Sequence, residues 1–164
     1  MARPLPAWLF RRFLNWWPPY RGAGIRVTAL AADWHHVRIE LRPGLRNRNY
    51  FGTHFGGSLY AMVDPFYVLM LVHVLGADYL VWDQAAEIEF VKPGRGVVSA
   101  EIRLDPAEVG RIRREAAGGE KVLPEFAIEI RDAGGEVVAR VRKRLYIRLK
   151  KRARPGAEQP GAGP

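Results

Sequence analysis

Apolar and polar residues alternate with a period of two in several stretches of the chain, a pattern typical of half-buried β-strands. The clearest case, 35–43, places valine, isoleucine and leucine on one face and mostly charged residues on the other. Glycine- and proline-rich turns separate such stretches. The pattern predicts six strands, over 24–34, 35–43, 83–92, 97–105, 124–132 and 136–150.

Two segments at the surface have the character of helices. Residues 5–17 are amphipathic and end at a pair of prolines. We expect this helix to pack on the domain's own sheet; contact with a membrane surface is the alternative, because tryptophan and arginine suit the lipid headgroup region. A second, charged helix is predicted over 106–117, with Asp105 as its N-cap and Pro106 as its first residue.

Residues 57–75 are apolar on all sides, which predicts a buried helix. Within it, the best candidate for a membrane span is 59–75, which is slightly short and carries Asp64, Pro65 and His73. Strands and helices do not alternate one for one, so a doubly wound parallel sheet is not expected. The order predicts an α+β fold in which one antiparallel sheet wraps around one apolar helix.

Composition limits the organisation and the partners of the chain. Its 164 residues favour one domain, over 24–149, preceded by the helical segment 1–23 and followed by a disordered basic tail, 150–164. The net charge of +9 favours anionic partners. Absence of cysteine excludes thiolate chemistry and, with no secretory signal in the N-terminal residues, favours the cytoplasm.

One carboxylate stands inside the apolar helix. Asp64 follows Gly57 by seven residues, about 20° short of two helical turns, so both share a face about 10 Å apart along the axis. An amide at Gly57 could polarise a thioester carbonyl, and Asp64 could activate water or attack the carbonyl carbon. The alternative is that Asp64 caps a second helix starting at Pro65.

The string "NYFGTHFGG", followed by this aspartate, resembles the signature N-x-x-G-x-x-H-G-G of hotdog-fold acyl-CoA thioesterases of the phenylacetyl-CoA thioesterase type. The resemblance covers about residues 24–148. The strings "THFGG", "DPFY", "VWD" and "KPGRG" resemble still more closely a bacterial branch of that superfamily known only as a domain of unknown function. The matching positions are Asn49, Gly52, Gly56, Gly57 and Asp64.

The resemblance implies a hotdog fold, a homodimer or homotetramer, and hydrolysis of an acyl-CoA or acyl-carrier-protein thioester. It implies that the Gly57 N–H holds the oxyanion, that Asp64 is the general base or nucleophile, and that Asn49 orients water or substrate. Asp83 would assist from the partner subunit. The expected substrate-binding residues are His54, Phe55, Gly56 and Ser58.

The chain departs from the signature in two places. Phe55 replaces the histidine before the glycine pair, with His54 one residue earlier, and Pro65 follows the acid. Two further functions on the same fold therefore stay open, namely a non-catalytic acyl-CoA-binding or regulatory protein, and a hydratase or dehydratase using His54 as acid and base.

Other chemistries have weaker support. No histidine pair has a zinc-like spacing and no serine has triad context, so we expect neither metal nor cofactor. Arginines on the strand 136–150 could meet coenzyme A phosphates or an acidic carrier protein, or form a solvated sheet face. A nucleic-acid-binding module is the rival class, but most aromatics fall at core positions, so we do not expect it.

Overall fold

The computed structural model describes residues 5–45 and 47–154, and its main feature is one seven-stranded antiparallel sheet. The strand order is β1-β2-β4-β6-β7-β3, with the short β5 paired to β7. All six predicted strands are present, although β3 begins at Tyr79 rather than at 83, and β5 was not predicted. The strands are β1 Ile25–Leu30, β2 His36–Leu41, β3 Tyr79–Phe90, β4 Val98–Arg103, β5 Lys121–Val122, β6 Glu125–Asp132 and β7 Val137–Leu149.

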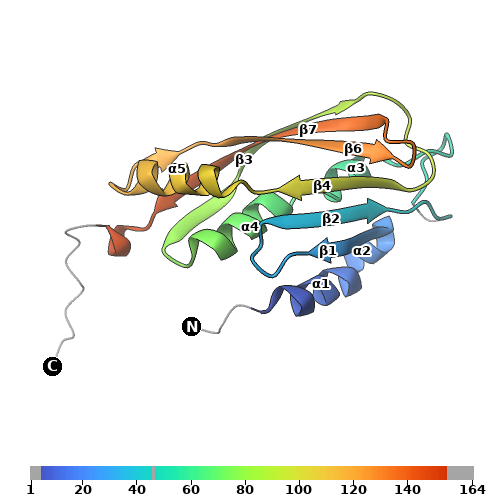
Figure 1. The fold of residues 1–164 in the computed structure, drawn as a ribbon. Coiled ribbons are helices and arrows are strands. Elements are labelled where there is room, and N and C mark those ends of the chain that lie inside the picture. The colour runs from blue at the N-terminus through green and yellow to red at the C-terminus, as the bar shows by residue number, and fades with distance from the viewer. Residues whose placement is uncertain (1–4, 46, 155–164) are drawn as a thin grey trace.

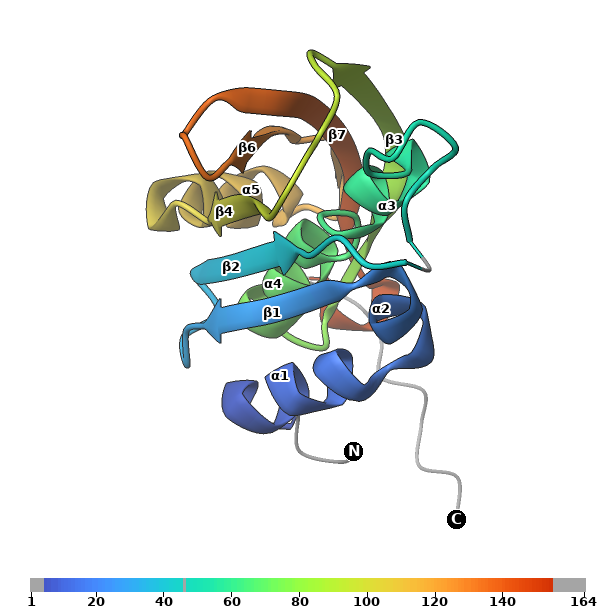
Figure 2. The same cartoon turned by 90° about the vertical axis from the view of Figure 1, so that its right-hand side faces the viewer.

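The sheet curves around two consecutive helices, α3 (Gly56–Ala61) and α4 (Phe66–Leu75), as Figures 1 and 2 show. Buried residues alternate along β2, β4 and β7, so one face of these strands packs toward the core while the other faces outward. The helices contribute Leu59, Phe66, Met70 and Leu71 to the core, and the turn between them contributes Met62. The predicted hotdog arrangement is therefore confirmed.

The central helix is not continuous, so the prediction of one helix over 57–75 is wrong in its middle. Residues 62–65 form turns between α3 and α4. The cause is Pro65, which has no N–H to donate and disfavours helical backbone in the residue before it. Asp64 makes no side-chain hydrogen bond to the start of α4, whose N-cap position is Pro65 itself. The alternative that Asp64 serves as a helix cap is therefore wrong.

Taken as one segment, Gly56–Leu75 is long and apolar enough to cross a membrane by length and composition alone. Half of its most apolar window is buried within the fold. Core helices of this kind pass the same test, and α4 contributes Phe66, Tyr67, Met70, Leu71 and Leu75 to the core. The segment, interrupted at 62–65, is the helical core of the domain.

The N-terminal helices α1 (Ala7–Trp16) and α2 (Pro18–Ala23) cover the β1 edge of the sheet (Figure 1). The Asn15 amide replaces a neighbouring strand: it accepts from the Val27 N–H at 2.8 Å and donates to the Val27 carbonyl at 3.0 Å. Arg11 donates to the Thr28 carbonyl at 2.8 Å. Because these side chains use the free backbone groups of β1, this edge is closed to further strands. Packing of the helix on its own sheet is confirmed.

The opposite edge, β3, is long and uncovered. Nearly all of its residues are exposed or half-exposed on both faces, in contrast to the buried alternate positions of β7. Leu80, Trp82 and Phe90 are 39%, 46% and 55% exposed. An edge strand that is both apolar and unpaired is a template for pairing with another chain.

The start of α5 agrees with the sequence prediction. Helix α5 (Pro106–Ala116) begins at Pro106, and the Asp105 carboxylate accepts from the Ala107 N–H at 2.8 Å. After β7 a short 3-10 helix, η1 (Lys151–Ala153), occupies the first part of the predicted tail. The rest of that prediction, 155–164, lies outside the described residues.

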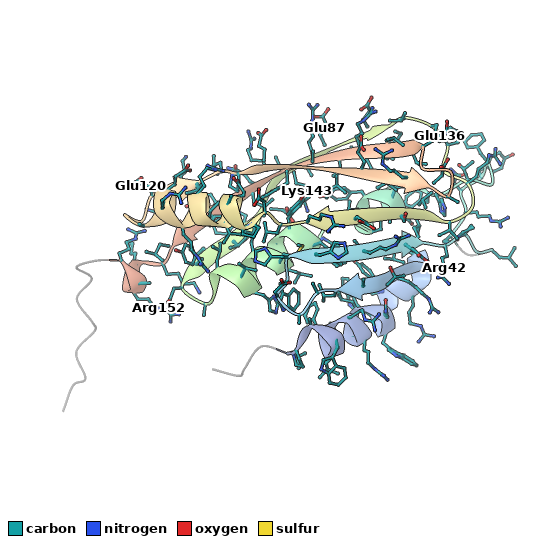
Figure 3. All side chains as sticks on the ribbon, viewed as in Figure 1. Arg42, Glu87, Glu120, Glu136, Lys143 and Arg152 are labelled. Carbon is teal, nitrogen blue, oxygen red and sulfur yellow. The ribbon has the colours of Figure 1, made fainter. Side chains whose placement is uncertain are left out.

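On the outer face of β3, β6 and β7, arginines and glutamates of neighbouring strands form ion pairs. Arg142 lies 2.9 Å from Glu87, and Arg140 lies 3.4 Å from both Glu89 and Glu129. Figure 3 shows Glu87 projecting outward. These exposed pairs add little stability each, but they neutralise the arginine stripe. The interpretation of 136–150 as a solvated face is therefore favoured over a phosphate-binding one.

Candidate active site

The centre of the candidate site is Lys143, a lysine whose side chain is 0% exposed. Its ammonium lies 2.9 Å from Oδ1 of Asp64 and 2.9 Å from Oδ1 of Asp83. It also donates to the backbone carbonyl of Asp64. The carboxylates are more open, with side chains 42% and 31% exposed. One buried cation therefore holds two carboxylates at the edge of the core; these three residues are called the carboxylate–lysine cluster below.

Strand register explains how β3 and β7 contribute to this cluster. Asp83 pairs with Leu145, and Ala86 pairs with Lys143. Lys143 and Leu145 are two residues apart on β7, so the side chains of Asp83 and Lys143 lie on the same face of the sheet, toward the central helices. The register shifts between Asp83 and Ala85, which leaves Gln84 as an extra residue. Such bulges redirect side chains. Figure 3 shows Lys143 on the side of the sheet that faces the helices.

Asp64 reaches the same lysine from the turn between α3 and α4. Pro65, which breaks the helix, thus places the carboxylate at an exposed corner rather than along a continuous buried helix. Pro65 is one of the two departures from the thioesterase signature. The helix break that it causes and the bulge of β3 together bring two carboxylates to one cation.

The electrostatics of the cluster are shaped by burial. Burial raises the pKa of Asp83 above its ordinary value, while the hydrogen bond and charge of Lys143 oppose that rise. Burial and the neighbouring Asp64 carboxylate likewise raise the pKa of Tyr60, whose ring centroid lies 5.7 Å from the Lys143 nitrogen. With both aspartates ionised, one ammonium faces two carboxylates, and the cluster keeps a formal charge of −1.

The start of α3 supplies backbone donors. Among the described residues, neither the Gly56 N–H nor the Gly57 N–H has a hydrogen-bond acceptor, whereas the Ser58 and Leu59 amides donate to the Phe55 carbonyl. The Phe55 ring lies over Gly57, where an added Cβ would come within 2.4 Å of its Cε1. This ring is 59% exposed, so it covers the amide region without being locked in the core.

Strand β3 lies beside the start of α3. A Cβ on Gly56 would come within 2.9 Å of the Phe90 ring at the end of β3. Phe90 and Phe55 are both more than half exposed. The backbone donors, the exposed aromatics and Asp83 therefore all adjoin the uncovered edge strand.

The profile of the family described as Domain of unknown function (DUF4442) matches residues 6–147. The chain belongs to the DUF4442 family. The match includes α1 and α2 as well as the sheet, so the N-terminal helices are part of the DUF4442 unit. A comparison with curated proteins finds no match.

Solved structures with a similar fold include several thioesterases. PA5026 from Pseudomonas aeruginosa, of unknown function and described as "Probable Thioesterase", is 23% identical with a TM-score of 0.75, over 91% of this chain and 99% of that one. Thioesterase HI1161 from Haemophilus influenzae is 15% identical with a TM-score of 0.64, over 90% and 93%. The PaaI protein of the E. coli phenylacetic acid degradation operon is 15% identical with a TM-score of 0.59, over 85% and 91%. These similarities establish the hotdog fold.

Asn49 organises its own loop in this DUF4442 domain. Its Oδ1 accepts from the N–H groups of Phe51 and Thr53, both at 3.0 Å, and its Nδ2 donates to Thr53 Oγ1 at 2.8 Å and to the His54 carbonyl at 3.2 Å. Both donors and both lone-pair directions of the amide are thereby used. The expectation that Asn49 orients a water has no support in this geometry.

His54 is directed away from the carboxylate–lysine cluster. It is 4% exposed, and its Nε2 lies 2.7 Å from the Gly96 carbonyl, to which it donates. The ring also packs against Gly94, so it fastens the 93–96 turn to the loop before α3. Ser58 is buried in the first turn of α3. Neither residue shares a contact with Asp64 or Asp83 among the described residues.

Lys143 was missed by the sequence analysis, although a signal existed. In β7 the apolar phase runs through Val141, Leu145 and Ile147, and Lys143 occupies the same phase. A lysine in the buried phase of a strand needs counter-charges. Among the described residues, no group of three histidines, aspartates or glutamates could hold a metal ion.

Proposed function

We propose that this domain hydrolyses an acyl-CoA or acyl-carrier-protein thioester, with Asp64 as general base or nucleophile. The observation that carries the proposal is the Asp64 carboxylate, which a buried lysine anchors through Oδ1 while the side chain stays 42% exposed. The N–H groups of Gly56 and Gly57, which have no acceptor among the described residues, begin α3, the helix that precedes Asp64. Thioesterases among the fold neighbours support the choice of reaction.

As a general base, Asp64 would take a proton from a water molecule while that water attacks the thioester carbonyl. The Gly57 N–H would donate to the resulting oxyanion. Collapse of the tetrahedral intermediate then breaks the C–S bond, and the proton held by Asp64 passes to the departing thiolate. The products are a carboxylic acid and a free thiol, which balances the water consumed.

As a nucleophile, Asp64 would attack the same carbonyl carbon and release the thiolate, leaving an acyl anhydride on the aspartate. Water then hydrolyses this anhydride to the acyl carboxylic acid and the Asp64 carboxylate. Of the two protons of that water, one stays on the acid and the other is released to solvent, which protonates the departed thiolate. In both routes Lys143 holds the carboxylate in place, and the formal charge of −1 on the cluster preserves its ability to accept a proton or to attack. Asp83, in the same protomer as Asp64, is the second carboxylate on that lysine.

The working form in this proposal is a homodimer joined through β3. The β1 edge is closed by Asn15 and Arg11, while β3 is uncovered and apolar. Pairing of two β3 strands would cover Phe90 and place each candidate site at the contact between subunits. A homotetramer would add a second contact to this dimer. We place this activity in the cytoplasm.

A second candidate function is acyl-CoA binding without turnover. The Phe55 ring over Gly57 and the full use of the Asn49 amide favour it, because both remove groups that hydrolysis would use. A hydratase is not proposed, since His54 is buried and its Nε2 is bound to Gly96.

The test is thiol release from a panel of short, long and aromatic acyl-CoA thioesters. We compare the unmodified chain with Asp64→Asn and with Asp78→Asn, an exposed aspartate 3.7 Å from Arg152. Hydrolysis predicts turnover that falls about 100-fold or more in Asp64→Asn and is unchanged in Asp78→Asn. Saturable acyl-CoA binding without thiol release would contradict hydrolysis and support the binding function.

A further inference from the structure

Helix α1 presents two apolar faces, and the described residues bury one of them. The inner face packs Ala7, Phe10 and Leu14 against the core. The outer face carries large apolar side chains at helical spacing, and Trp8, Phe13 and Trp16 are 62%, 55% and 67% exposed. The complete outer set, called the α1 aromatic face below, is Leu5, Trp8, Leu9, Phe13, Trp16 and Trp17.

The same region carries unmatched positive charge. The first 32 residues contain five arginines and no aspartate or glutamate. Within the described part of the chain, no carboxylate lies within 4.0 Å of Arg12, Arg21 or Arg26, whereas Arg140 and Arg142 on the outer sheet face are paired with glutamates. Arg21 instead lies over the Trp16 ring, with its guanidinium carbon 4.9 Å from the ring centroid.

We infer that the α1 aromatic face docks on an anionic lipid surface. Tryptophan and phenylalanine favour the boundary between headgroups and acyl chains, and arginines beside them attract lipid phosphates. Leu5 and Leu9 add aliphatic area that gains from acyl chains but has no base to stack on in a nucleic acid. A second copy of this chain would bring a face with the same unmatched positive charge, which opposes pairing.

The position of this face is compatible with the proposed dimer. Strand β1, which α1 covers, and the free edge strand β3 are at opposite ends of the strand order. Figure 1 shows α1 on the far side of the molecule from β3 and β7. Docking through α1 therefore leaves β3 and the carboxylate–lysine cluster open. The inference does not depend on the chemistry proposed for that cluster.

The experiment is sedimentation of the full chain with extruded vesicles of phosphatidylcholine alone, or containing about 30% phosphatidylglycerol. We expect binding to the anionic vesicles only, with a blue shift of tryptophan fluorescence and loss of binding at high salt. Trp8→Ala/Trp16→Ala should reduce the partition coefficient about tenfold or more. Arg12→Gln/Arg21→Gln should do the same on anionic vesicles.

Two matched controls distinguish binding through the α1 aromatic face from nonspecific binding by exposed aromatics or by positive charge elsewhere. Tyr50→Ala/Phe51→Ala removes two aromatics that are 98% and 78% exposed elsewhere. Arg38→Gln/Arg103→Gln removes the same net charge from the β2–β4 face, where both arginines contact Glu101. Both controls should bind like the unmodified chain. Circular dichroism verifies that each variant is folded.

Four results would overturn the inference. The first is absence of vesicle binding, and the second is binding that neither α1 variant weakens. The third is stronger, salt-sensitive binding to single-stranded DNA that the Trp8→Ala/Trp16→Ala variant abolishes, which would make the face a nucleic-acid platform. Self-association lost in the same variant would likewise identify a second copy as the occupant.

Discussion

The ammonium of Lys143 lies 2.9 Å from the carboxylate of Asp64, although the lysine side chain is fully buried and that of the aspartate is 42% exposed. A buried cation is costly unless it is paired. Loss of both aspartates would therefore destabilise the buried lysine, whereas the partly exposed aspartates can be hydrated without it. The pair therefore couples the stability of the domain to the residue that we propose as catalytic.

This coupling predicts non-additive effects on stability. Asp64→Asn and Asp83→Asn each leave Lys143 one carboxylate, and each should lower the free energy of unfolding by about 1 kcal/mol or less, because both aspartates are partly hydrated. The double variant leaves an unpaired buried ammonium and should lose about 3–5 kcal/mol. Urea unfolding of the four proteins measures the coupling. Simple additivity would contradict it.

A second prediction concerns pH. Burial raises the pKa of Asp83, and Lys143 holds that rise in check. Lys143→Met removes the opposing charge, so the pKa of Asp83 should rise further. Titration of the Asp83 carboxyl by NMR should therefore move to higher pH.

The control for this shift is Lys92→Met, which removes a lysine paired with Asp132 and Glu136. It should leave the titration of Asp83 in place. A titration of Asp83 that stays fixed in Lys143→Met would show that Asp83 does not share the lysine in solution. Lys143→Arg, which keeps the charge, should partly restore the original profile.

Local features could be predicted from the sequence, and features that depend on pairing could not. Asp105 and Pro106 start α5 through contacts within a few residues, so their roles follow from spacing alone. The cluster of Asp64, Asp83 and Lys143 requires the order of the strands, a bulge and a helix break to act together. Among the predicted site residues, Asp64 and Asp83 are bound to the same side chain, that of Lys143.

The loop before α3 shows the limit of a motif. Asn49, Gly56 and Gly57 stand in the register of the thioesterase signature, yet the Asn49 amide is used within its own loop. Sequence spacing fixes where a side chain starts, whereas its hydrogen-bond partners decide what it can still bind.

Gly57→Ala tests the proposed oxyanion donor. The new methyl group would meet the Phe55 ring, which is exposed and can move, so the fold should be retained with a loss of about 1 kcal/mol or less. Turnover should fall about 100-fold if a carbonyl must approach this amide closely. Phe55→Ala in the same background relieves the contact, and it should restore stability without restoring the rate. If Phe55→Ala restored the rate, the loss of turnover in Gly57→Ala would be due to the contact with the Phe55 ring and not to the Gly57 amide.

The uncovered strand predicts a dimer that a single charge can weaken. Sedimentation should show a dimer for the unmodified chain, and Ala85→Lys in the middle of β3 should shift it toward monomer, because edge lysines oppose strand pairing. Ala117→Lys, at the exposed end of α5, adds the same charge elsewhere and should remain dimeric. A monomeric unmodified chain would contradict pairing through β3.

The opposite edge gives the converse prediction. The Asn15 amide occupies both the N–H and the carbonyl of Val27, so it protects β1 as a neighbouring strand would. Asn15→Leu leaves these two groups without protein partners and should cost about 1–3 kcal/mol. It should also create a second open edge, so larger, concentration-dependent oligomers should appear in light scattering. Arg12→Leu, on the exposed side of the same helix, adds a leucine without freeing a backbone group; equal oligomerisation in that variant would assign the effect to surface hydrophobicity instead.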